Sequence, residues 1–263
     1  MGAVELLSQV EAGVLVLTMN RPEAANAISF EMLELYENEL ERAAMDPAIH
    51  SVVLTGQGLA AFSVGLDLGL LFEHITANPS GEQIRRVQRE LQELFTLLEH
   101  LEKPTIAAIE GTCSGGGLEL ALACDLRVAS ADAKFSLPET KLGMLPWLGG
   151  TSRLARLAGP AAAKEWIFTG RTYSSVRALE LGLITELVVP GDARARAVTL
   201  AKELAANSPL AIGWAKRIVD RAPSLSLEEA LELEQHAMSE ILPGPQLREG
   251  VLAFLEKRAP KFR

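Results

Sequence analysis

Three short apolar runs constrain the fold of this chain more than any other feature. They occupy residues 51–56 (SVVLTG), 105–111 (TIAAIEG) and 125–130 (DLRVAS). Runs of this length and β-branched content are typical of strands that are buried on both faces of a sheet. Residues 82–102 carry apolar side chains at three- and four-residue spacing, as an amphipathic helix does. The alternation of buried strands and helices predicts an α/β fold with a largely parallel sheet.

A hairpin and a capped helix precede the first buried strand. The pair Ala12-Gly13 predicts a tight turn ahead of a strand over residues 14–19. Ser29 predicts the N-cap of a helix that ends near residue 46. The apolar positions of this helix lie on one face: Met32, Leu33, Tyr36 and Leu40.

Helical patterns dominate the chain beyond residue 150. One short strand is expected within residues 184–189, and the expected helices cover residues 151–157, 161–168, 175–181, 193–206, 210–220 and 227–242. From about residue 195 the chain is helical without a core pattern of its own, as an appendage packed on the main domain or on another subunit would be. We therefore expect a core over residues 1–195 and a C-terminal helical region over residues 196–263.

Composition and charge disfavour several classes of partner. The net charge is −9, and nucleic-acid binding draws on clustered Lys and Arg, so we expect no nucleic-acid partner. No run approaches the roughly 18 apolar residues of a membrane span, and residues 1–20 lack the pattern of a secretory or organelle signal. We expect a cytoplasmic protein with no membrane partner. Cys113 and Cys124 are expected to be small buried thiols, with a disulfide between them as the alternative.

A run of three glycines at residues 115–117 resembles several ligand-binding motifs but fits none of them. The spacing departs from Gly-x-Gly-x-x-Gly, no Gly-Lys-Ser/Thr follows, and Thr112 stands where a nucleophile elbow needs glycine. The four histidines are scattered without metal-ligand spacing, so no metal site is predicted. What remains is a glycine turn entering a helix, whose free N–H groups can bind a developing oxyanion.

Two glutamates accompany this turn. Glu119 lies in the first turn of the expected helix among apolar residues, and Glu139 follows Pro138 in a loop bounded by Gly143 and Pro146. Each could be ordinary, because first-turn glutamates stabilise helices and loops are usually polar. Paired carboxyl groups near an oxyanion site can instead activate a water and transfer a proton. The residues alone leave both alternatives open.

The chain as a whole resembles the enoyl-CoA hydratase/isomerase (crotonase) family. Family markers occur in order along essentially its full length: NRPEAANAIS, SVVLTGQGLAAFSVGLDL, KPTIAAIEGTCSGGGLELALACDLRVAS, FSLPETKLGMLPWLGGTSRLARLAG, TGRTYSSVRALELGLITELV and FLEKRAPKF. The resemblance implies a crotonase-like superhelix of ββα turns with a C-terminal helical trimerisation region, assembled as a homotrimer or homohexamer. It also implies an acyl-CoA thioester as substrate and no cofactor, since coenzyme A is part of the substrate.

The resemblance gives roles to the glycine turn and to both glutamates. Family members hold the thioester carbonyl oxygen on two backbone N–H groups, which by position belong to Leu66 and Gly116, and so stabilise an enolate. Glu119 and Glu139 fall where hydratases carry a base for the attacking water and a proton donor to the α-carbon. Isomerases usually keep only the second glutamate, and decarboxylases commonly lack the pair.

These roles predict an enoyl-CoA hydratase. The nearest alternative is another reaction of the family, double-bond isomerisation or decarboxylation. More distant alternatives are a non-catalytic binding protein, with RNA as a conceivable ligand, and a thioester hydrolase.

Further positions follow from the resemblance at the coenzyme A end. It implies coenzyme A contacts at five residues in two segments: Ala24, Ala27, Val64, Asp67 and Leu68. Lys257 matches a basic residue that reaches phosphate, often from a neighbouring subunit, although a solvated lysine is an equal alternative. Glu23 stands where a basic residue frequently helps to hold the phosphates, so one such contact is expected to be missing.

Trp147 is the main departure from the family pattern. The family usually shows PGxGGT where this chain has PWLGGT, so Trp147 replaces the glycine whose amide helps to hold the catalytic water. The amide survives this change, but an indole beside the acyl pocket would shrink or reshape it. The alternative is that the side chain turns away into the core or a subunit interface.

Overall fold

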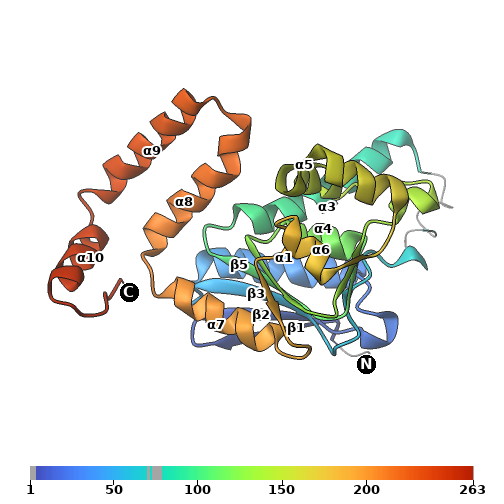
Figure 1. Cartoon of the computed structure of the whole chain (residues 1–263), viewed down its shortest axis with the longest axis horizontal. Coiled ribbons are helices and arrows are strands. Elements are labelled where there is room, and N and C mark those ends of the chain that lie inside the picture. Colours follow the sequence, from blue (N-terminus) through green and yellow to red (C-terminus); the bar gives the residue numbers. More distant parts are fainter. Residues whose placement is uncertain (1–3, 70–71, 73–78, 263) are drawn as a thin grey trace.

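The computed structural model describes residues 4–69, 72 and 79–262. Its central layer is a six-stranded sheet in the order β1-β2-β3-β5-β7-β10 (Figure 1). The strands are β1 (Leu6–Glu11), β2 (Val14–Met19), β3 (Ser51–Gly56), β5 (Thr105–Ile109), β7 (Leu126–Ser130) and β10 (Glu186–Val188). β1 pairs antiparallel with β2 and the later pairings are parallel, as the apolar runs predict. Ala12 and Gly13 both have positive φ, which a two-residue hairpin turn requires.

A second sheet of shorter strands lies beside the first, in the order β4-β6-β8-β9. Its strands are β4 (Ala61–Ser63), β6 (Thr112–Ser114), β8 (Lys134–Ser136) and β9 (Tyr173–Ser174). The chain passes from β3 to β4, from β5 to β6 and from β7 to β8, and each pair precedes a helix: α3 (Gly81–His100), α4 (Gly116–Leu122) or α5 (Gly150–Thr169). Repetition of this unit forms the ββα superhelix, so the predicted fold class is confirmed.

Local signals explain where the helices begin and break. The Ser29 hydroxyl accepts a hydrogen bond from a backbone N–H in the first turn of α1 (Phe30–Met45). A reciprocal capping box of Ser80 and Gln83 starts α3. Gly159 has a φ of 81° and interrupts α5 just before a proline, which confirms the two separate helices expected there.

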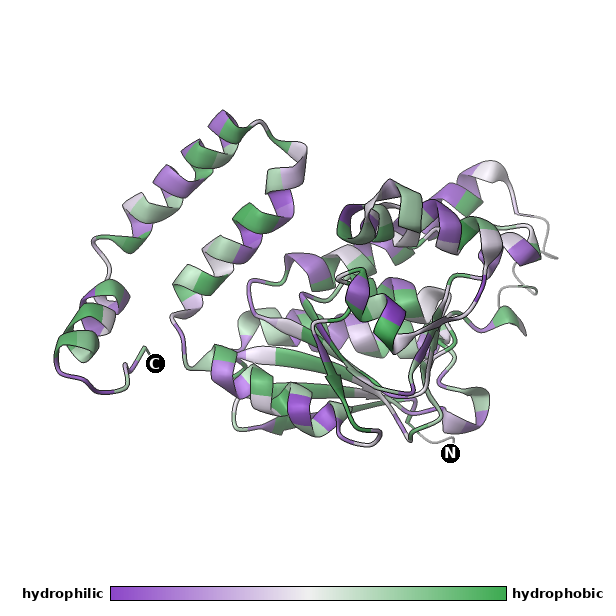
Figure 2. Ribbon diagram, viewed as in Figure 1, coloured by the Kyte–Doolittle hydropathy of each residue, from purple (hydrophilic) through white to green (hydrophobic). Residues whose placement is uncertain are grey.

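Helices cover both faces of the main sheet. One face packs against α1 and α3 in a core that includes the fully buried Leu17, Leu40 and Leu98. The other face packs against α7 (Ala193–Ala205), which buries Ala197 and Ala201 on the strands. Figure 2 shows the apolar residues concentrated along the strands between these layers. α7 belongs to this packed body although the expected boundary at residue 195 falls inside it; the division itself remains a prediction.

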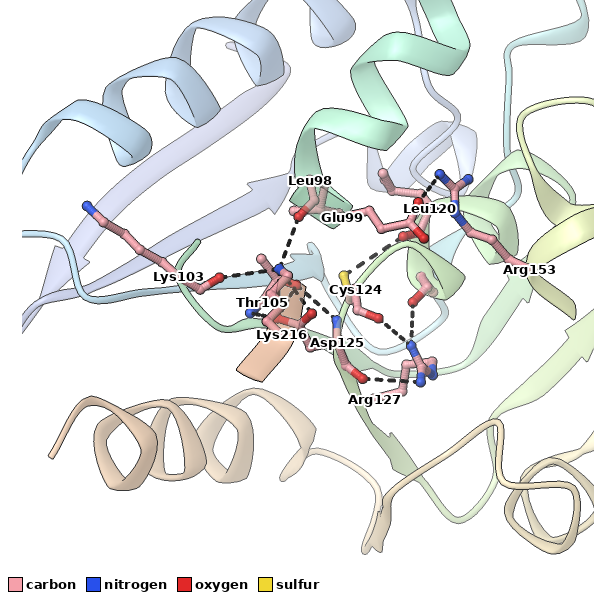
Figure 3. Close-up of polar contacts among 11 residues, drawn as sticks. Leu98, Glu99, Lys103, Thr105, Leu120, Cys124, Asp125, Arg127, Arg153 and Lys216 are labelled. Atoms are coloured by element: carbon pink, nitrogen blue, oxygen red, sulfur yellow. Dashed lines mark hydrogen bonds and ion pairs between the residues drawn. The ribbon is translucent and has the colours of Figure 1, made fainter. Parts of the chain in front are cut away.

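The last three helices follow α7 at the C-terminal end of the chain. α8 (Pro209–Arg221) lies beside it, and Lys216 of α8 forms an ion pair with Asp125 at 3.0 Å (Figure 3). α9 (Leu227–Ile241) and α10 (Pro245–Leu255) project away from the sheets (Figure 1). These two helices expose large apolar side chains, among them Leu227, Leu231, Met238, Val251, Phe254 and Leu255. A surface of this kind fits the expected oligomerisation role, which remains a prediction.

The sequence predicts neither a membrane-spanning segment nor a metal site, and the described residues bear on both. Among them, no helix combines the length and the apolar character needed to cross a membrane. No group of three or more His, Cys, Asp or Glu side chains with metal-binding geometry occurs in the same part of the chain. Cys113 and Cys124 are both buried and free, as the sequence predicts.

Candidate active site

The glycine turn at the start of α4 is in backbone contact with the loop that follows β4. A Cβ on Gly65, whose φ is 93°, would lie 2.5 Å from the Gly116 nitrogen. A Cβ on Gly117 would lie 2.4 Å from the Ser63 carbonyl oxygen. Distances this short exclude any side chain at either position. Glycine is therefore required because two main-chain segments meet here without intervening side chains.

Two backbone N–H groups remain free at this meeting point. Within the described chain, the N–H groups of Leu66 and Gly116 donate no hydrogen bond to a protein acceptor. A Cβ built on Gly116 would stand 3.3 Å from the Leu66 nitrogen, so the two donors lie close together. Gly116 is also the first residue of α4, at the positive end of its dipole. The pair is placed to bind one oxygen that carries negative charge.

Glu119 points from α4 to the turn before α5. Its side chain is 1% exposed, and its Oε1 accepts hydrogen bonds from the N–H groups of Leu148 and Gly150, each at 2.8 Å. Burial raises the pKa of Glu119 to about 7, and the nearby charge of Glu139 adds to this, while the two amides oppose it. The apolar surroundings of Glu119 in the sequence therefore produce a carboxyl group that exchanges its proton near neutral pH.

Glu139 completes the pair of buried carboxyl groups. It begins the 3₁₀ turn Glu139–Leu142 after β8, and its side chain is 7% exposed. Its Oε2 has no hydrogen-bond partner among the described residues, and burial raises the pKa of this carboxyl. A Cβ on Gly115 would lie 3.2 Å from Glu139 Oε1, which places the carboxyl beside the glycine turn. The structure thus brings together the two glutamates that the sequence singles out.

A cavity of about 790 Å³ opens beside this arrangement. Its lining includes Leu66 and Gly149, so it reaches both the free donor pair and the turn that holds Glu119. Apolar side chains of α1 and α3 line much of the rest: Phe30, Leu33, Ile84, Val87 and Leu91. Glu119 and Glu139 are not among its lining residues, but Glu119 is hydrogen-bonded to Leu148 and Gly150 on either side of Gly149. The volume suits a small organic ligand with an apolar portion.

Trp147 borders this cavity. It is half-buried, lies among the cavity-lining residues and also packs against the edge of the core. Its carbonyl accepts a hydrogen bond from Gln92 Nε2 at 2.6 Å. The backbone N–H of Trp147 donates to no protein acceptor in the described chain. Trp147 therefore belongs to the cavity wall and also contacts the core; that its indole shapes the acyl pocket remains a prediction.

The expected coenzyme A contacts form one surface, with one exception. Residues 24–28 and 64–68 lie side by side, joined by backbone hydrogen bonds such as Ile28 N–H to Gly65 O at 2.8 Å. Arg21 ties the two segments together by donating to the Ala27 carbonyl at 3.0 Å and to the Asp67 carboxylate at 3.1 Å. This brings together the five positions of the two segments: Ala24, Ala27, Val64, Asp67 and Leu68. Their coenzyme A role remains a prediction.

Lys257 is the exception. It follows α10, which projects away from the sheets (Figure 1), and is exposed. Within one chain the structure does not bring Lys257 to the site, because the C-terminal helices project away from the body. A contribution from Lys257 therefore requires a neighbouring subunit. Glu23 is exposed on the turn before α1, so a carboxylate stands at the position of the expected basic residue.

The sequence interpretation missed the groups that hold Glu119. Glu119 is bound by the amides of Leu148 and Gly150, and neither side chain suggests such a role. A Cβ on Gly150 would lie 2.8 Å from Glu119 Oε1, so only glycine allows this close approach. The one available signal was the Gly149-Gly150 pair ahead of a predicted helix, since such pairs mark close backbone contacts.

Comparison with known proteins agrees with this geometry. A sequence profile of the enoyl-CoA hydratase/isomerase family matches residues 9–263. The chain belongs to the enoyl-CoA hydratase/isomerase family. This family member is 41% identical over 248 residues to a putative enoyl-CoA hydratase/isomerase of Bacillus subtilis (strain 168), with 94% of each chain covered. The family predicted from the sequence motifs is therefore confirmed.

Two further relatives carry more specific names or a solved structure. The hydratase/isomerase family member is 34% identical over 253 residues to the short-chain-enoyl-CoA hydratase of Clostridium acetobutylicum, with 96% of this chain and 95% of that protein covered. The crystal structure of an enoyl-CoA hydratase from Bacillus anthracis matches it with a TM-score of 0.91 and 35% identity, over 98% of both chains. Both comparisons span the core and the C-terminal helices.

We expect Glu119→Gln to stabilise this hydratase/isomerase family member at high pH. The pKa of Glu119 is raised from 4.5 to about 7 by burial, so the contribution of the glutamate to stability is full below its ordinary pKa. That contribution is lost as the pH rises through about 7. Glutamine keeps an oxygen for both amides and does not ionise. The free energy of unfolding of the variant relative to wild type should therefore rise by about 3 kcal/mol between acidic and alkaline pH.

Urea unfolding of both proteins at a series of pH values measures this difference. A gap between variant and wild type that does not change with pH would show that Glu119 ionises freely in the folded protein.

Proposed function

We propose that this protein catalyses the reversible addition of water to an α,β-unsaturated acyl-CoA thioester. The observation that carries the proposal is the placement of two buried carboxyl groups, Glu119 and Glu139, beside two free N–H donors. Hydration needs a base for the water, an acid for the α-carbon and a site for the enolate oxygen, and this arrangement offers all three. The name of the Clostridium acetobutylicum relative, a short-chain-enoyl-CoA hydratase, supports the same reaction.

The free donors act on the thioester carbonyl in this scheme. The carbonyl oxygen accepts hydrogen bonds from the N–H groups of Leu66 and Gly116, which draws electron density away from the β-carbon. When water adds, the negative charge moves onto this oxygen as an enolate, and the two donors stabilise it. One such donor is worth about 2.7–4 kcal/mol of the activation barrier.

The two glutamates move the protons. Ionised Glu119 takes a proton from water as the water oxygen bonds to the β-carbon, and protonated Glu139 gives a proton to the α-carbon. Burial raises the pKa of both groups, that of Glu119 to about 7, which brings their proton exchange closer to neutral pH. Exchange of one proton with solvent then resets the pair. The free N–H of Trp147 precedes the Leu148 amide that binds Glu119, and in this scheme it helps to hold the water.

The cavity and the paired segments bind different parts of the substrate. The apolar wall formed by α1, α3 and Trp147 takes the acyl chain, and the surface of residues 24–28 and 64–68 takes coenzyme A. No metal or redox cofactor has a part in this scheme.

A panel of acyl-CoA substrates tests the proposed reaction. Purified protein is incubated with enoyl-CoA thioesters of several chain lengths and with an acyl-CoA that carries a carboxylate on its acyl chain, and the products are identified by mass spectrometry. A gain of one water supports hydration. A product of unchanged mass indicates isomerisation, loss of carbon dioxide indicates decarboxylation, and release of the free coenzyme A thiol indicates hydrolysis; any of these as the main reaction would overturn the proposal.

We expect Trp147→Leu to shift the enzyme toward longer acyl chains. Trp147 belongs to the cavity wall, and with its indole beside the acyl chain a smaller side chain would leave space that a longer chain can fill. A methylene in an apolar pocket is worth about 1–3 kcal/mol, so the ratio of kcat/KM for longer over four-carbon substrates should rise about tenfold or more. Kinetics at the enoyl-thioester absorbance band measure this ratio, with Phe168→Leu, an exposed site on α5, as control. An unchanged ratio would place the acyl chain elsewhere.

We also propose that the chain assembles as a homotrimer or homohexamer in the cytoplasm. The exposed apolar side chains of α9 and α10 support the assembly, because a monomer would leave them in water. Assembly through these helices would also carry Lys257 toward the coenzyme A surface of a neighbour. Sedimentation equilibrium gives the number of chains.

A further inference from the structure

The turn that holds Glu119 is itself held from behind by side chains. Three successive carbonyls of this turn accept side-chain hydrogen bonds. Pro146 O accepts from Thr151 Oγ1 at 2.6 Å, Trp147 O from Gln92 Nε2 at 2.6 Å and Leu148 O from Arg153 Nη1 at 2.9 Å. The amides of Leu148 and Gly150 point the other way, onto Glu119 Oε1. The direction of these amides therefore depends on what holds the carbonyls.

Arg153 is the one charged group among these three supports. It lies in the first turns of α5, and its side chain is 11% exposed. Nε and Nη2 of its guanidinium donate to Glu99 Oε2 on α3, at 3.0 and 2.6 Å, and Nη2 also reaches Thr96 Oγ1 at 3.4 Å. Figure 3 shows Arg153 and Glu99 facing each other beside Leu120 of α4. The guanidinium thus links α3 to the turn ahead of α5.

The guanidinium of Arg153 packs directly against Gly149. Its φ is 106°, and a Cβ there would lie 2.0 Å from Arg153 Nη1. The guanidinium therefore occupies the space over Gly149 and fixes the peptide on either side. A planar, five-donor guanidinium can bind a carbonyl and a carboxylate at once with little loss of side-chain freedom, which a lysine ammonium cannot do in the same geometry.

We propose that Arg153, anchored by Glu99, is a positioning residue for Glu119: it aims the Leu148 and Gly150 amides at the carboxylate and adds a positive charge behind the turn that carries them. This inference rests on the proposed function, in which ionised Glu119 is the base. Arg153 does not touch the substrate cavity, so its action reaches the reaction only through the turn and through its charge.

The electrostatic part of the inference has a definite direction. Burial and the charge of Glu139 raise the pKa of Glu119, whereas the positive charge of Arg153 lowers it. Loss of that charge shifts the balance further toward the protonated form. A base that is protonated at neutral pH cannot accept a proton from water, so the acid limb of the pH–rate profile should move to higher pH.

Three variants separate position from charge. Arg153→Gln removes both the charge and the planar set of guanidinium N–H donors. Arg153→Lys keeps the charge but not this set of donors, and Glu99→Gln weakens the ion pair that anchors Arg153. For Arg153→Gln we expect kcat for hydration near pH 7 to fall by about 10–10² fold, with KM little changed and the acid limb moved upward. Arg153→Lys should lose part of kcat but keep the wild-type acid limb, and Glu99→Gln should show a smaller loss.

Arg156→Gln is the matched control. Arg156 lies on the same helix, is exposed and bonds Ser224 rather than the turn, so its removal should leave both kcat and the pH profile unchanged. An acid limb that stays in place in Arg153→Gln, or moves equally in Arg156→Gln, would overturn the inference.

A second measurement does not depend on hydration activity. A double-mutant cycle combines Arg153→Gln with Glu119→Gln, and urea unfolding is followed at about pH 5 and about pH 8. We expect the coupling between the two sites to grow at the higher pH, where Glu119 is ionised. A coupling that is the same at both pH values contradicts the inference even if the enzyme hydrates enoyl-CoA.

The same double-mutant cycle distinguishes a failure of the proposed function from a failure of the link between Arg153 and Glu119. If wild type turns over no enoyl-CoA but the pH-dependent coupling is present, the proposed function fails while the link between Arg153 and Glu119 stands. If Arg153→Gln does not fold, Arg153→Lys and Glu99→Gln test the positioning role through kcat instead: both should lower kcat for hydration with the acid limb in place, and an unchanged kcat in both would overturn the inference.

Discussion

Replacement of either Glu119 or Glu139 by glutamine is expected to lower kcat for hydration by about 10²–10⁴ fold, with KM changed little. Glutamine keeps the size of the side chain, and at position 119 it keeps an oxygen for the Leu148 and Gly150 amides. What it removes is the ability to take or give a proton, which the reaction needs at both carbons of the double bond. Steady-state kinetics on the best substrate of the acyl-CoA panel measure the effect.

Glu110→Gln is a matched control for this experiment. Glu110 is also a buried glutamate, 5% exposed, and its Oε1 accepts two backbone N–H groups, those of Gly191 and Ala193. It anchors the start of α7 rather than the cavity, so Glu110→Gln should leave kcat near the wild-type value. If Glu119→Gln lowered kcat no more than Glu110→Gln does, Glu119 would be a structural anchor like Glu110.

The two glutamates can be told apart by isotope exchange. A saturated acyl-CoA has an α-proton but no place for water to add, so exchange of that proton with deuterium oxide needs only Glu139 and the enolate site. Glu119→Gln should therefore keep much of this exchange, whereas Glu139→Gln should lose it. The opposite pattern would reverse the proposed roles.

Gly116→Ala is expected to lower kcat by about 10²–10³ fold, the loss typical of removing one oxyanion donor. The added Cβ would stand 3.3 Å from the Leu66 nitrogen, in the space that the substrate oxygen needs. The backbone of Gly116 is helical rather than left-handed, so alanine fits the conformation and the fold should persist. Kinetics together with circular dichroism separate loss of activity from loss of structure.

Two other glycines define the control for this substitution. Gly81→Ala places a Cβ 3.7 Å from the Arg85 side chain, an ordinary contact at the start of α3, and should change neither stability nor rate. Gly117→Ala places a Cβ 2.4 Å from the Ser63 carbonyl and should instead destabilise the fold. A Gly116→Ala enzyme with the kcat of Gly81→Ala would show that the carbonyl oxygen binds elsewhere.

Elements with a strong local signal were predictable from the chain alone. The apolar runs that became β3, β5 and β7, the cap at Ser29 and the break at Gly159 all depend on neighbours close in sequence. The strands of the second sheet were not predicted individually. β4, β6 and β8 have three residues each, too few to show a period, and they exist because parallel neighbours pair with them.

The candidate site also contains residues that the sequence indicates and residues that only the structure shows. Glu119 stood out because a lone acid in an apolar helix start is unusual, and Glu139 because it sits in a loop framed by proline and glycine. Local sequence could not show that these two carboxyl groups meet, nor that Trp147 is a residue of the cavity wall. Arg153 gave no signal, because its role depends on Glu99 of another helix and on a carbonyl of the preceding turn.

The sequence by itself determined the class of fold, the family and the two acids most worth testing, since strand burial, helix capping and motif order are all written in short stretches of chain. Tertiary structure alone decided the proton affinity of Glu119, the approach of Leu66 to Gly116 and the support of the turn by Arg153. These depend on desolvation and on distances of a few ångströms between segments far apart in sequence, which no local pattern encodes.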